Sequence, residues 1–195
     1  MEKFYLEIPS LKRKEAIIAY LNEFVLYNSD INGSGFLDKI LEGYSFEECL
    51  DKCLNMQYQE YAKKLNRLQS KTFLLIRKND NKLIGMLNIR WNIPPNIQEF
   101  VGNIGYGIRP TERKKGYNKI NLYLGLIEIQ KLGLKKIYLD CEDNNIASYK
   151  TMESLNAKLL STKIDPYDNL LTRIYSIDVN KTINKYRSTY QKYIL

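Results

Sequence analysis

The sequence contains no histidine, only three cysteines and no long apolar run. Without an imidazole, the mechanisms that rely on histidine as a base are excluded, including Ser-His-Asp and Cys-His nucleophilic sites. Three cysteines fit a reducing compartment better than a disulfide framework. Cys49 and Cys53 lie one helical turn apart, but the chain offers no histidine to complete a ligand set, so we expect no metal.

The features of membrane and secreted proteins are also missing. No stretch approaches the roughly 18 apolar residues that a membrane span needs. The N-terminus carries an acidic residue early and has no apolar run behind it, unlike a signal peptide. We therefore expect a cytoplasmic protein without a membrane partner. No repeat, low-complexity linker or domain boundary is visible, so 195 residues that are 44% hydrophobic predict one domain.

What the chain does carry is a formal charge of +8 at pH 7. Such a charge suits nucleic acid, an anionic cofactor or no specific partner. The basic residues are spread along the chain instead of forming one block, which weakens the case for a nucleic-acid surface.

The hydrophobic pattern predicts a mixed α/β sheet with helices on both faces. A long helical region can break near Gly43, and Gly133 is a C-terminal helix stop. Predicted strands cover residues 4–8, 72–77, 82–91, 100–108, 136–141, 159–163 and 171–179. Predicted helices cover about 10–25, 36–68, 117–132, 146–155 and the tail from 180.

The most informative stretch is residues 103–118, which read Asn-Ile-Gly-Tyr-Gly-Ile-Arg-Pro-Thr-Glu-Arg-Lys-Lys-Gly-Tyr-Asn. A strand that ends at Pro110 is followed by a basic loop, closed by Gly116, and then by a helix. This arrangement directs free backbone N–H groups and the positive end of the helix dipole at one point. Arg113, Lys114 and Lys115 add cations there, so the loop suits a pyrophosphate.

Two motifs resemble those of the GNAT superfamily of acyl-CoA-dependent N-acetyltransferases. The run Arg113-Lys114-Lys115-Gly116-Tyr117-Asn118 follows the family signature of Gln or Arg, two residues, Gly, one residue, then Gly or Ala, except at Asn118. Downstream, Asn145 with Ser148 resembles the family's Asn-x-x-Ser form, and Asn156 stands where a Gly usually closes that helix. The longer pattern is similar to a bacterial branch of mostly uncharacterised acetyltransferases and covers about residues 83–159.

The resemblance implies the GNAT (acyl-CoA N-acyltransferase) fold, a single-domain mixed, mostly antiparallel sheet with splayed central strands flanked by helices. Within a domain spanning 1–195, it assigns a strand and acceptor-side helices to 1–70. It assigns a cofactor-binding core to 71–163, and the final strand and C-terminal helix to 164–195.

The same resemblance implies acetyl-CoA as co-substrate. Its pantetheine arm would insert between the splayed strands and pair with the backbone near Gly107, Ile108 and Arg109. Asn145 would contact the arm or simply cap its helix, since Asn is among the best N-caps. The expected cofactor-binding residues are Ile108, Arg109, Arg113, Lys114, Lys115, Gly116, Tyr117, Asn118, Asn145 and Ser148.

The catalytic groups are less clear from the resemblance. Members often place a Tyr four residues beyond the Ser as the acid for the departing thiolate, but Met152 stands there and cannot donate a proton. Tyr149 is the nearest alternative, although it points to another side of an ideal helix and could instead pack on the sheet. Glu99, just before the fourth strand, is the candidate base; its alternative is an exposed edge carboxylate.

Three other side chains near these motifs have simpler interpretations. Tyr106 is expected to be a core aromatic with a bonded hydroxyl. Trp91 could line the acceptor pocket or pack in the core. Glu112 is expected to be a surface charge or a charge at a helix end.

The leading hypothesis is an N-acetyltransferase that moves an acetyl group from acetyl-CoA to a primary amine of a small molecule or peptide by direct attack on the thioester. The acidic stretch 38–51 could face a cationic acceptor or only solvent. A non-catalytic acyl-CoA-binding or regulatory module is the alternative that Met152 motivates. Charge and sixteen tyrosines leave a nucleic-acid-binding protein as a third interpretation. The tail from 180 could pack on its own sheet or on a partner's, which leaves a homodimer open.

Overall fold

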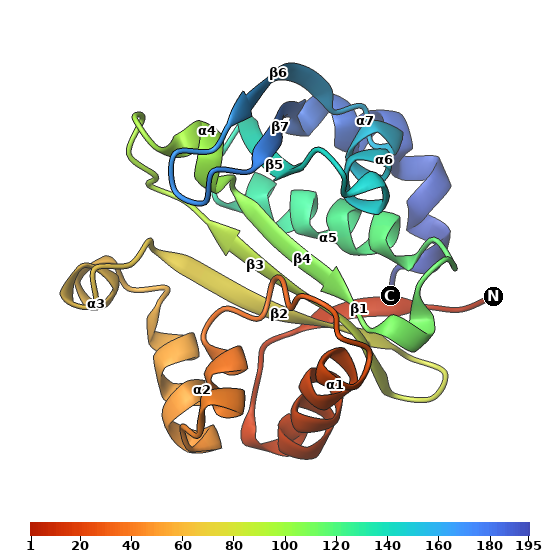
Figure 1. The fold of residues 1–195 in the computed structure, drawn as a ribbon. Coiled ribbons are helices and arrows are strands. Elements are labelled where there is room, and N and C mark those ends of the chain that lie inside the picture. Colours follow the sequence, from red (N-terminus) through yellow and green to blue (C-terminus); the bar gives the residue numbers. More distant parts are fainter.

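Two antiparallel sheets lie at the centre of the structure (Figure 1), a computed structural model that describes residues 1–195 apart from the side chain of Glu99. The first sheet has the order β1-β2-β3-β4 and the second the order β5-β7-β6. Their bounds are β1 Phe4–Glu7, β2 Ser70–Arg77, β3 Lys82–Arg90, β4 Ile104–Ile108, β5 Lys136–Glu142, β6 Lys158–Ile164 and β7 Leu171–Asp178. The predicted mixed α/β architecture is therefore confirmed.

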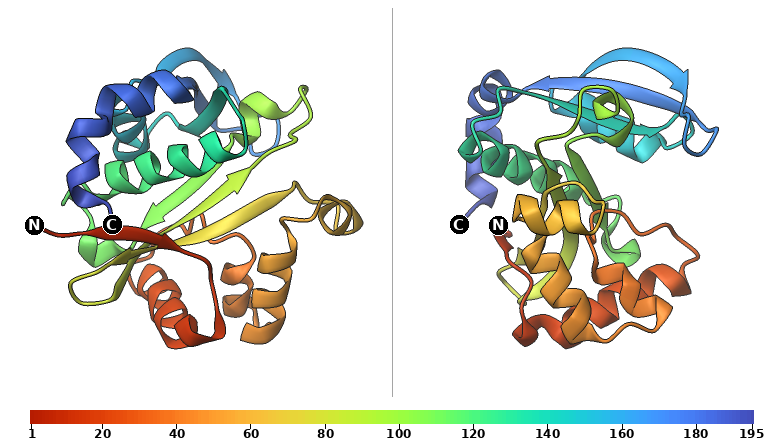
Figure 2. Two further views of the ribbon diagram at one scale, coloured as in Figure 1. Left: turned by 180° about the vertical axis from the view of Figure 1, so that it is seen from behind. Right: turned by 90° about the vertical axis from the view of Figure 1, so that its left-hand side faces the viewer.

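Strand β2 separates two hydrophobic cores because successive side chains of a strand point to opposite faces. Leu74 and Ile76 face the core formed with α1 (Lys14–Leu26) and α2 (Phe46–Asn55), whereas Phe73 and Leu75 face the other core. Figure 2 shows α1 and α2 on one side of the first sheet and α5 (Tyr117–Lys131) on the opposite side.

The second core lies between both sheets and three helices. Helix α5 packs on β3 and β4 and is also covered by α6 (Ile146–Ser154) and α7 (Val179–Tyr190), so it is apolar on most of its circumference. After the turn Gln191–Tyr193, Ile194 forms a parallel bridge with Phe4, which places the two termini side by side (Figure 1). No helix in the described residues has the length and apolar character to cross a membrane.

Two predicted elements are wrong in their boundaries. The helical region 36–68 consists of a 3-10 turn (Leu37–Glu42), α2 and the short α3 (Gln59–Lys64), with the break at Gly43 located as expected. The predicted strand 100–108 begins instead with a helical turn, α4 (Gln98–Val101), and β4 starts only at Ile104. Gly102 separates α4 from β4, because its φ of 58° is a backbone angle that glycine adopts readily and that neither a helix nor a strand contains.

Candidate functional site

Strands β4 and β5 meet at one residue, Asn103, and then diverge. The Asn103 N–H donates to the Tyr138 carbonyl at 2.7 Å, and its side-chain oxygen accepts from the Tyr138 N–H at 2.8 Å. Its side-chain amide also donates to the carbonyl of Arg90 on β3 at 3.1 Å. Beyond this point the two strands belong to different sheets and form no ladder in the described part of the chain. Asn103 therefore marks the closed end of a V-shaped gap.

The edge of β4 that faces this gap carries backbone polar groups. The Arg109 N–H donates to the Ile84 carbonyl, and the Arg90 N–H donates to the Asn103 carbonyl. In and beside β4, the backbone N–H and C=O groups of odd-numbered residues therefore point toward β3. Because the direction of these groups alternates along an antiparallel strand, the N–H and C=O groups of Tyr106 and Ile108 turn toward the gap. The Ile108 carbonyl accepts a bond from the Arg113 side chain at 3.1 Å, which agrees with this direction.

The face of β4 on which Gly105 and Gly107 lie is covered by the loop that follows α1. A Cβ on Gly107 would come within 2.8 Å of the Asn32 carbonyl, and a Cβ on Gly33 would come within 2.8 Å of the Gly105 carbonyl. The glycines of the Gly-Tyr-Gly sequence in β4 thus allow this loop to approach the strand closely and to form one wall of the gap.

The basic loop lies at the open end of the gap, between the turn Pro110–Glu112 and α5. Lys114 (φ 63°) and Gly116 (φ 81°) hold the loop in a left-handed conformation. Gly116 is the N-cap of α5 and provides no side-chain cap, and among the described residues the N–H groups of Gly116, Tyr117 and Asn118 have no protein acceptor. These amides face a cleft of about 1330 Å³ that extends between β4, β5 and α6. Together with the helix dipole they form an anion cradle.

Glu112 links the loop to the first sheet and is buried, so the expectation of a surface charge is wrong. Its side chain is only 4% exposed and accepts bonds from Lys82 (2.7 Å), Lys115 (2.8 Å) and Arg77 (3.1 and 3.3 Å). Burial alone would raise the pKa of Glu112, but the bonds from Lys115, Lys82 and Arg77 outweigh it and lower the pKa to about 2. The carboxylate is therefore ionised at all ordinary pH values and serves as a structural anion.

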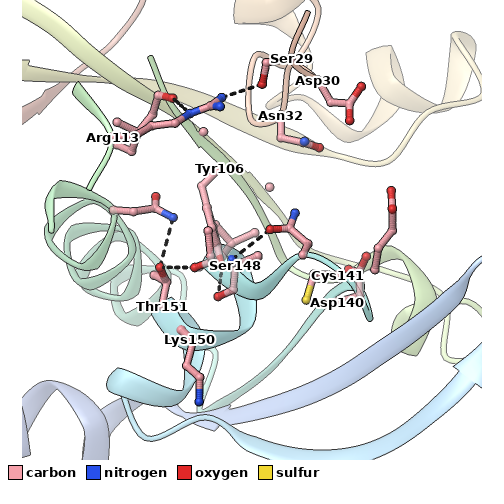
Figure 3. A pocket seen from close by; sticks show the side chains of 18 of the residues that line it. Ser29, Asp30, Asn32, Tyr106, Arg113, Asp140, Cys141, Ser148, Lys150 and Thr151 are labelled. Carbon is pink, nitrogen blue, oxygen red and sulfur yellow. Dashed lines mark hydrogen bonds between the residues drawn. The ribbon is translucent and has the colours of Figure 1, made fainter. Parts of the chain in front are cut away.

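The two arginines of the predicted site serve structural roles with their side chains. Arg113 donates to Ser29 at 2.8 Å (Figure 3), and its guanidinium lies over the Phe24 ring. Arg109 forms an ion pair with Glu23. Both backbone groups of Arg109 are also occupied, by Ile84 and by the N–H of Glu112. The expectation that Arg109 pairs with an inserted arm is thus corrected, because it has no free backbone group there.

Helix α6 contributes polar groups to the other wall of the cleft. Asn145 caps the helix, accepting from the Ser148 N–H at 3.1 Å, and the Ser148 hydroxyl lies 3.0 Å from the Tyr106 hydroxyl (Figure 3). Burial raises the pKa of Tyr106, so its phenol stays protonated at neutral pH. Asn118 also approaches this wall, since its amide lies 3.5 Å from the Thr151 hydroxyl.

Two expected positions on α6 are directed elsewhere. Tyr149 packs on the core with the Arg173 guanidinium 4.2 Å from its ring centre, and it is not among the described residues that line the cleft. Met152 is 1% exposed in the same core. The placement of Tyr149 does not support its predicted role as acid, and the hydroxyl pair of Tyr106 and Ser148 lies in the cleft instead.

A second cavity of about 580 Å³ adjoins the closed end of the gap from the side of α2. Arg90 and Asp140 line both cavities. Asp140 lies two residues beyond Tyr138 on β5, and its carboxylate lies against Gly102, where a Cβ would collide with it. Burial raises the pKa of Asp140 to about 6 against the opposing charge of Arg90.

The acidic stretch 38–51 contributes only one acidic residue to these cavities. Asp38 lines the second cavity, whereas Glu42, Glu47 and Glu48 form ion pairs with neighbouring lysines. The predicted base Glu99 lies on α4, next to the same region, but its side chain is outside the described residues. Trp91 packs against the core, one of its two expected placements. Among the described residues no cluster of His, Cys, Asp or Glu suits a metal ion.

Sequence reasoning missed Asn103 and Asp140. Asp140 was visible only as the polar residue in the run Ile-Tyr-Leu-Asp-Cys, where a carboxylate interrupts an apolar strand. The hydrophobic pattern predicts Asn103 within an uninterrupted strand, and its role depends on a contact with β5 that no local pattern predicts.

The family model described as Acetyltransferase (GNAT) family matches residues 37–156. Comparison with curated proteins gives no match. Among solved structures, RimL, a ribosomal alpha-N-protein acetyltransferase in complex with coenzyme A, is 15% identical, with 90% of this chain and 94% of that chain covered and a TM-score of 0.65.

Spermidine N-acetyltransferase from Vibrio cholerae, in complex with CoA and spermine, is 15% identical over 93% of this chain and 99% of that chain (TM-score 0.62). An acetyltransferase of the GNAT family from Bacillus anthracis is 19% identical over 91% and 96% (TM-score 0.57). At these identities the likeness is one of fold.

Proposed function

The chain belongs to the acetyltransferase (GNAT) family, and from this premise we propose that it transfers the acetyl group of acetyl-CoA to a primary amine of a small molecule or peptide. The observation that carries the proposal is the pairing of an open amide cradle with a gap between β4 and β5. A diphosphate fits the cradle, and the arm that it carries fits the gap.

The residues of the cradle have distinct roles in this proposal. The N–H groups of Gly116, Tyr117 and Asn118 hold the pyrophosphate, with the α5 dipole behind them. Lys114 and Lys115 add longer-range attraction. The pantetheine amides pair with the gap-facing backbone of Tyr106 and Ile108, as an added strand would.

The reaction requires no nucleophile from the protein. The amine attacks the thioester carbon directly, and much of the acceleration comes from holding the two substrates close together in the reacting orientation. The Ser148 and Tyr106 hydroxyls lie in the cleft and can donate hydrogen bonds to the departing thiolate. They replace the Tyr that the family often has at the position of Met152. Glu99 stays the base candidate that the sequence suggests.

The acceptor is expected to reach the thioester through the second cavity. The solved relatives acetylate a ribosomal protein N-terminus and spermidine, according to their names. Both are amines that carry a positive charge at neutral pH. Asp38, Asp165 and Asp168 line the second cavity, which supports an acceptor of this kind.

The proposal is tested in two steps. Calorimetry with acetyl-CoA should give saturable binding near the micromolar range. Release of free thiol is then followed with spermidine and with a short peptide bearing a free N-terminus as probe acceptors, and amine-dependent release well above hydrolysis is expected. Binding without any amine-dependent release would favour the non-catalytic module. Absence of binding, combined with retention of DNA or RNA near 0.2 M salt, would favour the nucleic-acid interpretation.

A further inference from the structure

The two cavities share a short list of residues at the closed end of the gap, and Asp140 is the carboxylate nearest that end on β5. The two hydrogen bonds between Asn103 and Tyr138, here called the pin, close the gap, and Asp140 is the second residue of β5 after Tyr138 in the direction in which the gap opens. An arm that enters from the anion cradle and an amine that enters through the second cavity would therefore meet beside Asp140. The shared residues are Ile31, Asn32, Arg90, Asp140, Asp165 and Asp168.

The surroundings of Asp140 leave its carboxylate available for chemistry. In the described structure no hydrogen bond or ion pair joins the Asp140 side chain to another side chain; Arg90 acts on it through charge alone. The Arg90 guanidinium is directed instead to the Val101 carbonyl at 2.5 Å and to the Asn88 side chain at 3.2 Å. The titratable or charged groups that face Asp140 are Arg90 on β3, Tyr106 on β4, Cys141 on β5, and Asp165 and Asp168 between β6 and β7.

We propose that Asp140 accepts the proton of the attacking amine, and that Arg90 is a positioning residue that keeps this carboxylate ionised. The inference rests on the proposed acetyl transfer and assigns its proton acceptor to the junction of the two cavities.

An acceptor that enters as an ammonium ion first loses one proton to solvent, and from the neutral amine the proton balance of the step is complete without a further reactant. The amine nitrogen forms a bond to the acetyl carbon, and the carbon–sulfur bond breaks. The proton that the nitrogen loses passes to the Asp140 carboxylate and then to solvent, and the thiolate takes up a proton from solvent while the hydroxyl pair at Ser148 stabilises it.

The expected pH dependence follows from the surroundings of the carboxylate. Burial raises the pKa of Asp140 to about 6, so the carboxylate becomes a competent base as the pH rises through that value. Arg90 lowers the pKa of Asp140, so removal of its charge should move the acid limb of the kcat profile to higher pH. The Arg90→Lys variant keeps the charge and should keep the limb near 6, whereas Arg90→Met should not.

The decisive experiment compares Asp140→Asn with the wild type, using the better acceptor of spermidine and the N-terminal peptide. We expect kcat to fall about 100-fold or more, the acid limb near pH 6 to disappear and the Kd for acetyl-CoA to stay within about twofold. The neutral isostere keeps the shape of the site, and Asp51→Asn on α2, which lines neither cavity, is the matched control and should change none of these values.

Three outcomes would overturn the inference. The first is an Asp140→Asn variant that retains both kcat and the limb. The second is loss of the limb in Glu99→Gln but not in Asp140→Asn, which would return the role to Glu99. The third is the absence, in carboxyl-carbon NMR of the wild type, of an aspartate that titrates near pH 6 and is lost in Asp140→Asn. This measurement needs no turnover, so it tests the assignment even if the wild type acetylates neither probe, a result that would count against the proposed function itself.

Discussion

Glu112 and Asp140 are carboxylates at opposite ends of the same cleft, and their surroundings differ in one respect that decides their roles. Glu112 accepts four hydrogen bonds from Arg77, Lys82 and Lys115. Asp140 has one nearby cation, Arg90, and no direct bond to it. Hydrogen bonds to the charged form lower a pKa, whereas burial without them raises it.

The two ends of the cleft differ in which polar groups already have partners within the protein and which do not. At the cradle, the cations Arg77 and Lys82 are neutralised by Glu112, and the open groups are backbone amides. At the junction, the open group is a carboxylate that can change its protonation near neutral pH. In the proposed reaction the cradle binds the cofactor and the junction exchanges a proton.

The largest effect is expected from Glu112→Gln. This change removes the anion that Arg77, Lys82 and Lys115 share and should lower the free energy of unfolding by about 2–3 kcal/mol, since hydrogen bonds to a buried charged carboxylate are lost, although Arg77 keeps Glu2 and Asp80. Urea unfolding at pH 7 measures the loss. Glu60→Gln, at a carboxylate that is 85% exposed, should leave the stability unchanged.

The same variant tests the pH dependence. The pKa of Glu112 is lowered to about 2 in the folded state, whereas an unfolded Glu titrates near ~4.3. Its contribution is therefore present above pH ~4.3 and lost as the pH falls toward 2. Stability of the wild type should decline more steeply than that of Glu112→Gln in this window. Parallel curves would show that Glu112 is not the anchor of the loop.

The pin between the two sheets should give the next largest effect. Asn103→Ala removes the acceptor for the Tyr138 N–H and the donor to the Arg90 carbonyl, so we expect a loss of about 2 kcal/mol. Because the pin fixes where the gap closes, the Kd for acetyl-CoA should also rise several-fold. Asn103→Asp keeps the acceptor alone and should lie between the wild type and Asn103→Ala in both measurements.

The two ends of the cleft also differed in how far the sequence predicted them. The cradle was predicted because its signal is local: Gly116 follows three cations and precedes an apolar-periodic helix. The order of strands and helices along the chain followed from the hydrophobic pattern in the same way. The junction could not be predicted, since Asn103 and Tyr138 are far apart in sequence and Gly102, with a φ of 58°, interrupts the predicted continuous strand.

The expectation of a surface charge at Glu112 is wrong for a related reason. Glu112 looks like an exposed loop charge until β2 and β3 place Arg77 and Lys82 beside it. The predicted divisions of the chain at 70 and 163 and the role of Glu99 remain predictions.

The face of β4 that lies under the loop after α1 can be changed without changing the cradle. In Gly107→Ala the new Cβ would meet the backbone carbonyl of Asn32 at 2.8 Å, so the loop must shift, at a cost of about 1–2 kcal/mol. We expect a higher KM for the amine and an unchanged Kd for acetyl-CoA. In Gly105→Ala the Cβ would meet only the end of the Arg90 side chain at 2.9 Å and should cost less stability.

The smallest effect is expected at Lys114, an exposed loop cation that, unlike Lys115, has no bond to Glu112; no ion pair involves it in the described residues. Its φ of 63° is unfavourable for a residue with a Cβ, so Lys114→Gly should raise the stability by about 1 kcal/mol. The same change removes a screened, exposed charge and should weaken acetyl-CoA binding about threefold at low salt and not at 0.5 M salt. Calorimetry at both salt concentrations, with Lys12→Ala as the exposed control, measures this. An equal loss at both concentrations would mean that the lysine contacts a phosphate directly, and the cradle would then bind with side chains as well as with its amides.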